Sequence, residues 1–218
     1  MQRIFLSDLH LDDPLDRVFS GFAACLETES TQVDEIYILG DLVEMWIGDD
    51  DNSPIALALT ELLTTTSKRC PVFLMHGNRD FLFASEFTNR TGVTLISDPS
   101  TLDGSLVLSH GDALCTDDIA YQQIRKVLRG DAWQTEILSK SLEERQVFGK
   151  GLRAQSIANN ANKSSAIMDV NAAAVTDLIG ANVTTFIHGH THRPGIHPIV
   201  QRSAQRIVLG DWGPCGWL

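Results

Sequence analysis

Six short runs of apolar and β-branched residues recur along the chain, and each is too continuous to form a strand with one face in water. The runs span residues 4–7, 33–39, 72–76, 106–109, 183–187 and 207–209. Helical periodicity separates them, at residues 15–26, at 55–63 behind Ser53 and Pro54, and at 170–179 before Gly180. Buried strands that alternate with helices predict a layered α/β fold in which both faces of the sheet are covered.

Residues 120–165 depart from this alternation, because they are helical in composition and contain no strand-like run. The chain has 218 residues, 43% of them hydrophobic, which is enough for one sizeable core. No linker rich in proline, glycine or serine divides it. We therefore expect one domain with an insertion, namely a core formed by residues 1–119 and 166–218 and a helical insertion or lid at 120–165.

Charge and cysteine content narrow the class of protein. A net charge of -11 argues against a general nucleic-acid binder, which needs a basic surface to displace counterions from phosphates. The four cysteines form no CxxC pair, Met1 leads directly into a strand, and no apolar run approaches the roughly 18 residues that span a bilayer. We expect a cytoplasmic protein with reduced thiols.

Metal-capable side chains follow five of the six predicted strands directly. They are Asp8 and His10 in SDLH, Asp41 in LGDLVE, Asn78 in HGNRD, His110 in SHGD, and His190 and His192 in HGHTH. Ligands bind at the carboxyl ends of the strands in open α/β sheets, so we expect one shared site along a single edge of the sheet. His190 and His192 are two residues apart and should project the same way from an extended chain.

Each of these blocks also has an ordinary structural interpretation. The SDLH segment and Asn78 are compatible with turns after strands, and a lone His110 is compatible with a hydrogen-bonded core histidine. Five such blocks in order, each directly after a strand, are much harder to explain by chance. The set as a whole therefore favours a metal site.

The same ordered blocks carry a resemblance to a known family. Asp8-x-His10, Gly40-Asp41, Gly77-Asn78, His110 and Gly189-His190-x-His192 resemble the calcineurin-like metallophosphoesterases, whose α/β fold has two packed mixed sheets flanked by helices. Within that superfamily the chain is similar to the UDP-2,3-diacylglucosamine pyrophosphatases of Gram-negative lipid A biosynthesis, from Ile4 to about Gly210. The segments that carry this closer similarity are YILGDLVEMWIGDDD, HGNRDFL, SHGDALCTDD, NKSSAIMDVN and IHGHTHRP.

The resemblance implies a centre of two divalent metal ions that share Asp41. The first ion would be held by Asp8, His10, Asp41 and His192, and the second by Asp41, Asn78, His110 and His190. Oxygen and imidazole ligands without thiolate suit Mn²⁺ better than a structural zinc. Glu44 is expected to support the site without holding an ion.

Arg79 marks a departure from the wider superfamily, many of whose members carry GNHD where this chain has GNRD. Arginine stays charged and is a poor proton donor, so the site should favour a leaving group that needs no protonation, such as the phosphate of a pyrophosphate. We expect Arg79 to grip phosphate oxygens and to act in catalysis together with Asp41. Its ordinary interpretation is a surface arginine.

The predicted insertion carries eight basic and four acidic residues in an otherwise acidic chain. One interpretation is a solvated helical face. The other is a lid whose apolar side meets acyl chains and whose basic side meets anionic headgroups, as the resemblance implies. By the same resemblance the substrate would contact Asn78, Arg79, Asp118, Tyr121, Ser156, Asn160, Lys163 and His190.

The function implied is hydrolysis of the pyrophosphate bond of UDP-2,3-diacylglucosamine to UMP and 2,3-diacylglucosamine 1-phosphate, by hydroxide activated between the ions and attacking the α-phosphorus. One alternative is a metallophosphoesterase of the same fold that acts on a soluble nucleotide diphosphate or phosphodiester. Another is a non-catalytic interaction scaffold, which should have lost ligands, whereas all seven are present. The partners expected are the acylated UDP-sugar and, peripherally, the cytoplasmic face of the inner membrane, with no nucleic acid and no obligate protein partner.

Overall fold

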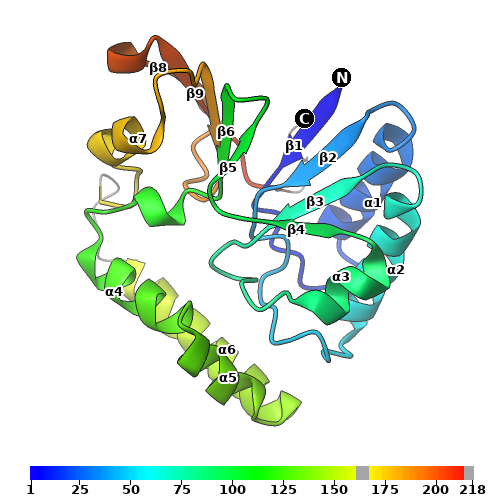
Figure 1. Cartoon of the computed structure of the whole chain (residues 1–218). Coiled ribbons are helices and arrows are strands. Elements are labelled where there is room, and N and C mark those ends of the chain that lie inside the picture. The colour runs from blue at the N-terminus through cyan, green and yellow to red at the C-terminus, as the bar shows by residue number, and fades with distance from the viewer. Residues whose placement is uncertain (161–166, 214–218) are drawn as a thin grey trace.

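Two β-sheets form the centre of the molecule (Figure 1). The computed structural model describes residues 1–160 and 167–213, and of Asn160 only the backbone. The first sheet has the order β1 (Arg3–Leu6), β2 (Glu35–Ile38), β3 (Val72–Met75) and β4 (Thr94–Ile96). The second has the order β5 (Ser100–Leu102), β6 (Leu106–Ser109), β7 (Thr185–His188), β9 (Ala204–Val208) and β8 (Gly195–Ile199).

The first sheet is parallel throughout, which corrects the expectation of two mixed sheets. Its parallel strands need long crossovers, and the helices between them supply these connections. The second sheet is mixed, since β5 and β8 run antiparallel to their neighbours while β6, β7 and β9 are parallel. The fold class predicted from the sequence is otherwise confirmed.

Helices cover the outer face of each sheet (Figure 1). On the first sheet lie α1 (Arg17–Glu29), α2 (Pro54–Ser67) and α3 (Ser85–Thr91), and on the second lies α7 (Ala172–Leu178). The predicted start of α2 is confirmed, because the Ser53 side chain accepts a hydrogen bond from the Ala56 amide and Pro54 opens the helix.

A third apolar cluster lies between the sheets and joins them. Phe5, Tyr37 and Phe73 are paired across β1, β2 and β3, and their rings stack with centroids 5.3 and 4.7 Å apart. Leu108 and Ile187 of the second sheet complete the cluster. Stacked aromatic pairs contribute about 0.5–1.5 kcal/mol each beyond the area that they bury, so this ladder helps to fix the two sheets against each other.

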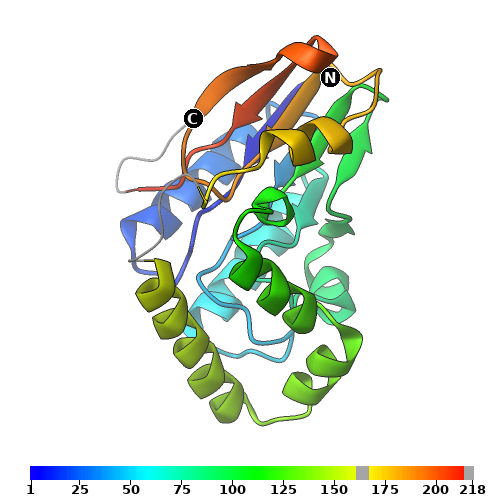
Figure 2. The same cartoon turned by 90° about the vertical axis from the view of Figure 1, so that its left-hand side faces the viewer.

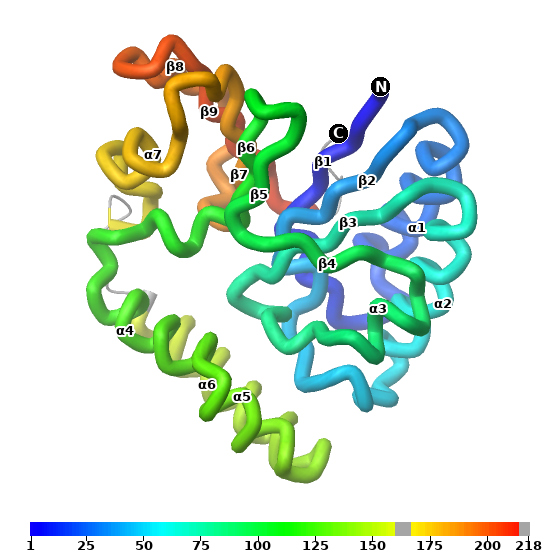
Figure 3. The backbone as a smooth tube through the Cα atoms, viewed as in Figure 1, coloured from blue at the N-terminus to red at the C-terminus, as the bar shows by residue number. Residues whose placement is uncertain are grey.

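Three helices follow one another between the second sheet's β6 and α7 (Figures 2 and 3). They are α4 (Ile119–Leu128), α5 (Asp131–Leu138) and α6 (Leu142–Asn160), and we call them the α4–α6 segment. Ile137 of α5 is buried in the core of the first sheet, and Trp133 packs against the same core. The segment is therefore anchored to the part of the fold that carries α1–α3.

Candidate metal centre and substrate cavity

The predicted ligands come from the carboxyl ends of strands in both sheets. Asp8, His10, Asp41 and Asn78 follow β1, β2 and β3 of the first sheet, whereas His110, His190 and His192 follow β6 and β7 of the second. The expectation of a single edge of one sheet is therefore wrong. The two sheets face each other, and their strand ends meet at one place.

Asp8, His10 and His192 form the first group of potential ligands, with one donor atom from each within 4.8 Å of the others. The Nε2 atoms of His10 and His192 are 3.2 Å apart, and His192 Nε2 is 3.4 Å from Asp8 Oδ1. Asp8 is fully buried. These are three of the four side chains that the sequence assigns to the first ion.

Asp41, His110 and His190 form the second group, again with donor atoms within 4.8 Å of one another. Asn78 adjoins it, because its Oδ1 lies 3.0 Å from His110 Nε2. Asp41 lies between the two groups: its Oδ1 is 3.7 Å from His110 Nε2, and its Oδ2 is 3.9 Å from His10 Nε2. The structure thus brings together all seven residues proposed as ligands.

The polarity of these atoms fits a cation. His110 Nδ1 is 2.8 Å from the Leu39 carbonyl and donates to it, so in the neutral ring Nε2 presents a lone pair to Asn78 Oδ1 and Asp41 Oδ1. Three acceptor atoms therefore face one another. Among the described residues no group donates a hydrogen bond to buried Asp8 Oδ1, which is costly unless positive charge lies beside it.

The pKa values of two histidines at the site also indicate that a cation binds there. Burial disfavours a charged His110, yet the carboxylates of Asp41, Asp112 and Asp8 raise its pKa to about 9. Burial and the neighbouring His110 lower the pKa of His190 to about 4, so its imidazole is neutral and available as a ligand. Without metal, His110 would bind a proton at neutral pH. A divalent ion would neutralise the same excess of negative charge.

Five of the seven predicted ligands have left-handed backbone, which the sequence did not reveal. The φ angles are 55° at Asp8, 51° at His10, 51° at Asp41, 68° at His190 and 54° at His192. This conformation costs roughly 1–2 kcal/mol for a residue with a side chain and is concentrated at functional sites. The argument from strand alternation was wrong for His190 and His192, which lie in the loop beyond β7 and enter different groups.

Two glycines allow the ligand loops to approach one another. A Cβ on Gly77 would lie 2.2 Å from the Asp41 amide nitrogen, and one on Gly189 would lie 2.3 Å from Asp8 Oδ2. No other residue fits at these contacts. The glycine before Asn78 and the glycine before His190 are thus part of how the site is built.

Asp80, which the sequence analysis passed over, ties two ligand loops together. Its buried carboxylate accepts hydrogen bonds of 2.7 Å from the amides of Gly77 and Leu42, beside Asn78 and Asp41 respectively. Burial and the nearby charge of Asp41 raise its pKa to about 6. The sequence feature that could have identified Asp80 was its position in the HGNRD block.

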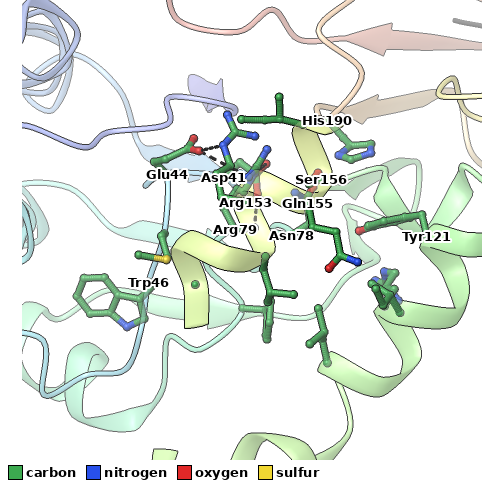
Figure 4. A pocket seen from close by; sticks show the side chains of 18 of the residues that line it. Asp41, Glu44, Trp46, Asn78, Arg79, Tyr121, Arg153, Gln155, Ser156 and His190 are labelled. Atoms are coloured by element: carbon green, nitrogen blue, oxygen red, sulfur yellow. Dashed lines mark hydrogen bonds and ion pairs between the residues drawn. The ribbon is translucent and has the colours of Figure 1, made fainter. Parts of the chain in front are cut away.

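A cavity of about 1020 Å³ opens from the metal centre toward the α4–α6 segment (Figure 4). Asp41, Asn78, Arg79 and His190 line its inner end. Apolar side chains line much of the rest, among them Phe81, Ile124, Leu128, Trp133 and Phe148. The cavity thus joins the polar side chains at the proposed ligands to apolar side chains of the α4–α6 segment, a combination that suits an amphiphilic ligand.

The structure places several of the predicted substrate-binding residues in this cavity. Arg79, Asp118, Tyr121 and Ser156 line it together with Asn78 and His190. Tyr121 also donates a 2.6 Å hydrogen bond to buried Asp112, and Asp118 caps α4 by accepting from the Tyr121 amide. Lys163 and the side chain of Asn160 lie outside the described residues.

Glu44 and Arg153 form a polar group beside the proposed ligands, and the sequence predicted a supporting role for Glu44 alone. Glu44 forms an ion pair with Arg153 Nε, and its carboxylate lies 3.6 Å from Arg79 Nη1 (Figure 4). The same carboxylate lies 3.4 Å from His10 Nδ1. Although burial opposes it, contact with His10, Arg79 and Arg153 lowers the Glu44 pKa. Glu44 thus supports a proposed ligand, as expected, whereas Arg153 was missed.

Comparison with known proteins identifies the family. A family model described as calcineurin-like phosphoesterase matches residues 1–194. Proteins named UDP-2,3-diacylglucosamine hydrolase from Marinobacter nauticus and Shewanella oneidensis are 41% and 43% identical to this chain. The alignments cover 100% of the chain and 92% of the first relative, and 97% of the chain and 90% of the second.

A solved structure supports the fold. A dimetal phosphatase from Danio rerio is 14% identical, covers 97% of this chain and 88% of its own, and superposes with a TM-score of 0.53. Together with the two ligand groups, the family indicates a site for two divalent metal ions. The chain therefore belongs to the calcineurin-like phosphoesterase family, in which it is similar over its full length to the UDP-2,3-diacylglucosamine hydrolases, and it is a metal-dependent hydrolase.

Proposed function

We propose that this protein hydrolyses the pyrophosphate bond of UDP-2,3-diacylglucosamine and releases UMP and 2,3-diacylglucosamine 1-phosphate. The observation that carries the proposal is the pair of ligand groups on either side of Asp41, in a cavity that apolar side chains of the α4–α6 segment also line. The names of relatives at 41–43% identity support the same substrate. In this arrangement the diphosphate would lie at the ligands and the acyl chains along the α4–α6 segment.

The proposed metal ligands are Asp8, His10, Asp41, Asn78, His110, His190 and His192, and the proposed ions are Mn²⁺. Bound there, the two ions would lower the pKa of a water molecule and neutralise charge on the phosphate. Asp41 would keep them in fixed relation, because each of its oxygens faces a different group.

The residues around the metal centre can bind and orient the diphosphate. Arg79 and Arg153 both line the cavity and both contact Glu44, so two guanidinium groups lie close to the proposed ligands. Guanidinium binds phosphate oxygens in a bidentate way and neutralises developing charge. A departing phosphate needs no proton, which agrees with arginine at position 79 where a histidine would have supplied one.

We further propose that residues 120–165 act as an insertion over this site and make peripheral contact with the cytoplasmic face of the inner membrane. Helices α4 and α6 expose Ile119, Val127, Val147 and Ile157, each by more than half of its surface. No helix among residues 1–160 and 167–213 is long and apolar enough to cross a membrane. The proposed contact is thus one of surface binding and acyl-chain capture.

The test is release of UMP from UDP-2,3-diacylglucosamine with Mn²⁺, before and after chelation, and with Asp41→Ala. The proposal expects turnover that chelation abolishes, Mn²⁺ restores and Asp41→Ala lowers by several orders of magnitude. Equal kcat/KM on the acylated substrate and on UDP-N-acetylglucosamine would favour a hydrolase of soluble nucleotide diphosphates instead. Turnover that survives both chelation and Asp41→Ala would contradict the metal-dependent chemistry.

A further inference from the structure

Helix α6 rests on the loop that follows β2 through three residues spaced four apart. Arg145, Gly149 and Arg153 fall on one face of the helix. Their partners, taken in the opposite chain direction, lie between Glu44 and Asp50. We call this contact the α6 seam. The same loop carries Asp41, the residue proposed to bridge the ions.

Arg145 closes the far end of the seam. Its side chain is 4% exposed, and its NH1 donates hydrogen bonds of 2.7 Å to the Ile47 carbonyl and to Asp50 Oδ1. Its Nε donates to the Lys140 carbonyl. A buried guanidinium whose donors are satisfied in this way fixes a geometry, because loss of Asp50 would leave its charge without compensation.

Gly149 occupies the middle of the seam, where the Met45 side chain lies against the helix. A Cβ built on Gly149 would lie 1.9 Å from Met45 Sδ and 3.2 Å from Met45 Cε. Glycine inside a helix is less stable than alanine, so its presence here calls for a reason, and this contact supplies one. Gly151 lies two residues further on, and no atom of residues 1–160 or 167–213 comes within 4 Å of such a Cβ there.

Arg153 ends the seam at the metal centre. It contacts Glu44, which also contacts Arg79 and His10 (Figure 4). The next turn of α6 carries Ser156, which lines the cavity. The seam thus links the position of α6 directly to the polar end of the cavity.

We propose that Gly149 and Met45 are positioning residues that set the height of α6 over the metal centre and so determine specificity for the acylated sugar. This inference rests on the proposed function. The proposal requires that helix α6, rather than the Met45 side chain alone, yields to an added methyl group, which would move Arg153 and Ser156 relative to the proposed ligands. Hydrolysis of a small phosphodiester, which needs the ligands but not α6, should be far less affected.

The test compares Gly149→Ala with Gly151→Ala as the matched control, on UDP-2,3-diacylglucosamine and on bis(p-nitrophenyl) phosphate. We expect Gly149→Ala to raise KM for the acylated substrate by about tenfold or more, since misplacement by about 1 Å can cost on the order of 100-fold. Its kcat/KM on the small diester should stay within about threefold of wild type, as should both activities of Gly151→Ala. Equal losses on both substrates, or no difference between the two variants, would overturn the proposal.

A second substitution tests whether the effect of Gly149→Ala comes from its contact with Met45 or from a general loss of structure. Met45→Ala removes the atoms that clash, so in the Gly149→Ala background it should restore KM for the acylated substrate to within about threefold of wild type. A double variant no better than Gly149→Ala would show that the effect does not pass through Met45.

The melting temperature distinguishes failure of this inference from failure of the proposed function. If the wild type cleaves the small diester but not the acylated sugar, the proposed function is wrong and the substrate comparison no longer applies. The seam then predicts a lower melting temperature for Gly149→Ala than for Gly151→Ala, with recovery on Met45→Ala. Identical melting temperatures for all three variants would refute the seam itself.

Discussion

Asp41 and His110 come from different sheets, yet Asp41 Oδ1 lies 3.7 Å from His110 Nε2 while the other oxygen of the same carboxylate lies 3.9 Å from His10 Nε2. The Arg79 amide donates a 2.8 Å hydrogen bond to Asp41 Oδ1 and holds the carboxylate in this orientation. Each oxygen therefore faces a separate group of ligands. A carboxylate placed in this way is suited to bridge two cations.

The close approach of Gly77 to Asp41 predicts that Gly77→Ala abolishes activity. The added methyl group would lie 2.2 Å from both the Asp41 amide nitrogen and its Oδ1, so the loop that carries Asn78 must move away. We expect kcat/KM to fall by about 100-fold or more, with a clear loss of thermal stability. Gly21→Ala is the control, because nothing lies within 4 Å of its Cβ, and it should stabilise helix α1 by about 0.5–1 kcal/mol. Near wild-type turnover in Gly77→Ala would contradict this account of the loop contact.

Two substitutions of Arg79 should separate the effect of its positive charge from that of its planar guanidinium group. Arg79→Ala should lower kcat by about 100- to 1,000-fold, the effect of removing a donor aimed at developing charge. Arg79→Lys keeps the charge but not the bidentate fork, so it should recover only part of the loss. Steady-state kinetics with saturating Mn²⁺ measures both variants. Full activity in Arg79→Ala would leave this side chain without a part in the reaction.

Asp112 predicts a pH-dependent contribution to stability. Its buried carboxylate accepts from Tyr121 at 2.6 Å and from Arg125 Nε at 2.7 Å, and although burial opposes ionisation, His110 and Arg125 hold its pKa well below the ordinary value near 3.8. Because the Asp112 pKa is lower in the folded than in the unfolded protein, its ionised carboxylate stabilises the fold at pH values above the ordinary pKa. This stabilisation is lost as the pH falls through the folded pKa. Asp112→Asn should lower the free energy of unfolding by about 3 kcal/mol at pH 7.

Urea unfolding of metal-free protein between pH 7 and pH 3 checks this prediction. The difference between wild type and Asp112→Asn should be constant down to about pH 5 and should shrink below about pH 4. A difference that grows as the pH falls would mean that the Asp112 pKa is raised instead.

The positions of six strands along the chain and of the proposed ligands after five of them were predictable, because each lies in a local pattern. Apolar runs mark buried strands, and the polar residue after each run marks its carboxyl end. All six predicted strands were confirmed to within a few residues, as was the start of α2. Strands β4 and β5 were missed because each has three residues and mixed polarity, and β8 was missed because it includes Pro198 and exposed side chains.

The arrangement of these blocks in space could not be predicted, because it depends on contacts between residues far apart in the sequence rather than on local patterns. Nothing in the spacing of the ligand blocks indicates that the first three belong to one sheet and the last two to another. The left-handed backbone at Asp8 or His192 was not predictable, since Asp and His adopt it more often than most residues but still only rarely. Arg153 was overlooked because its role depends on Glu44, more than 100 residues away in sequence.

The central claim is that two cations share the carboxylate of Asp41, and a crystal structure of the Mn²⁺-loaded protein with data at the manganese absorption edge tests it most directly. We predict two anomalous peaks about 3.5–4 Å apart, one near Asp8, His10 and His192 and the other near Asn78, His110 and His190, each in contact with one oxygen of Asp41. A single peak, or two peaks of which one makes no contact with Asp41, would contradict the account.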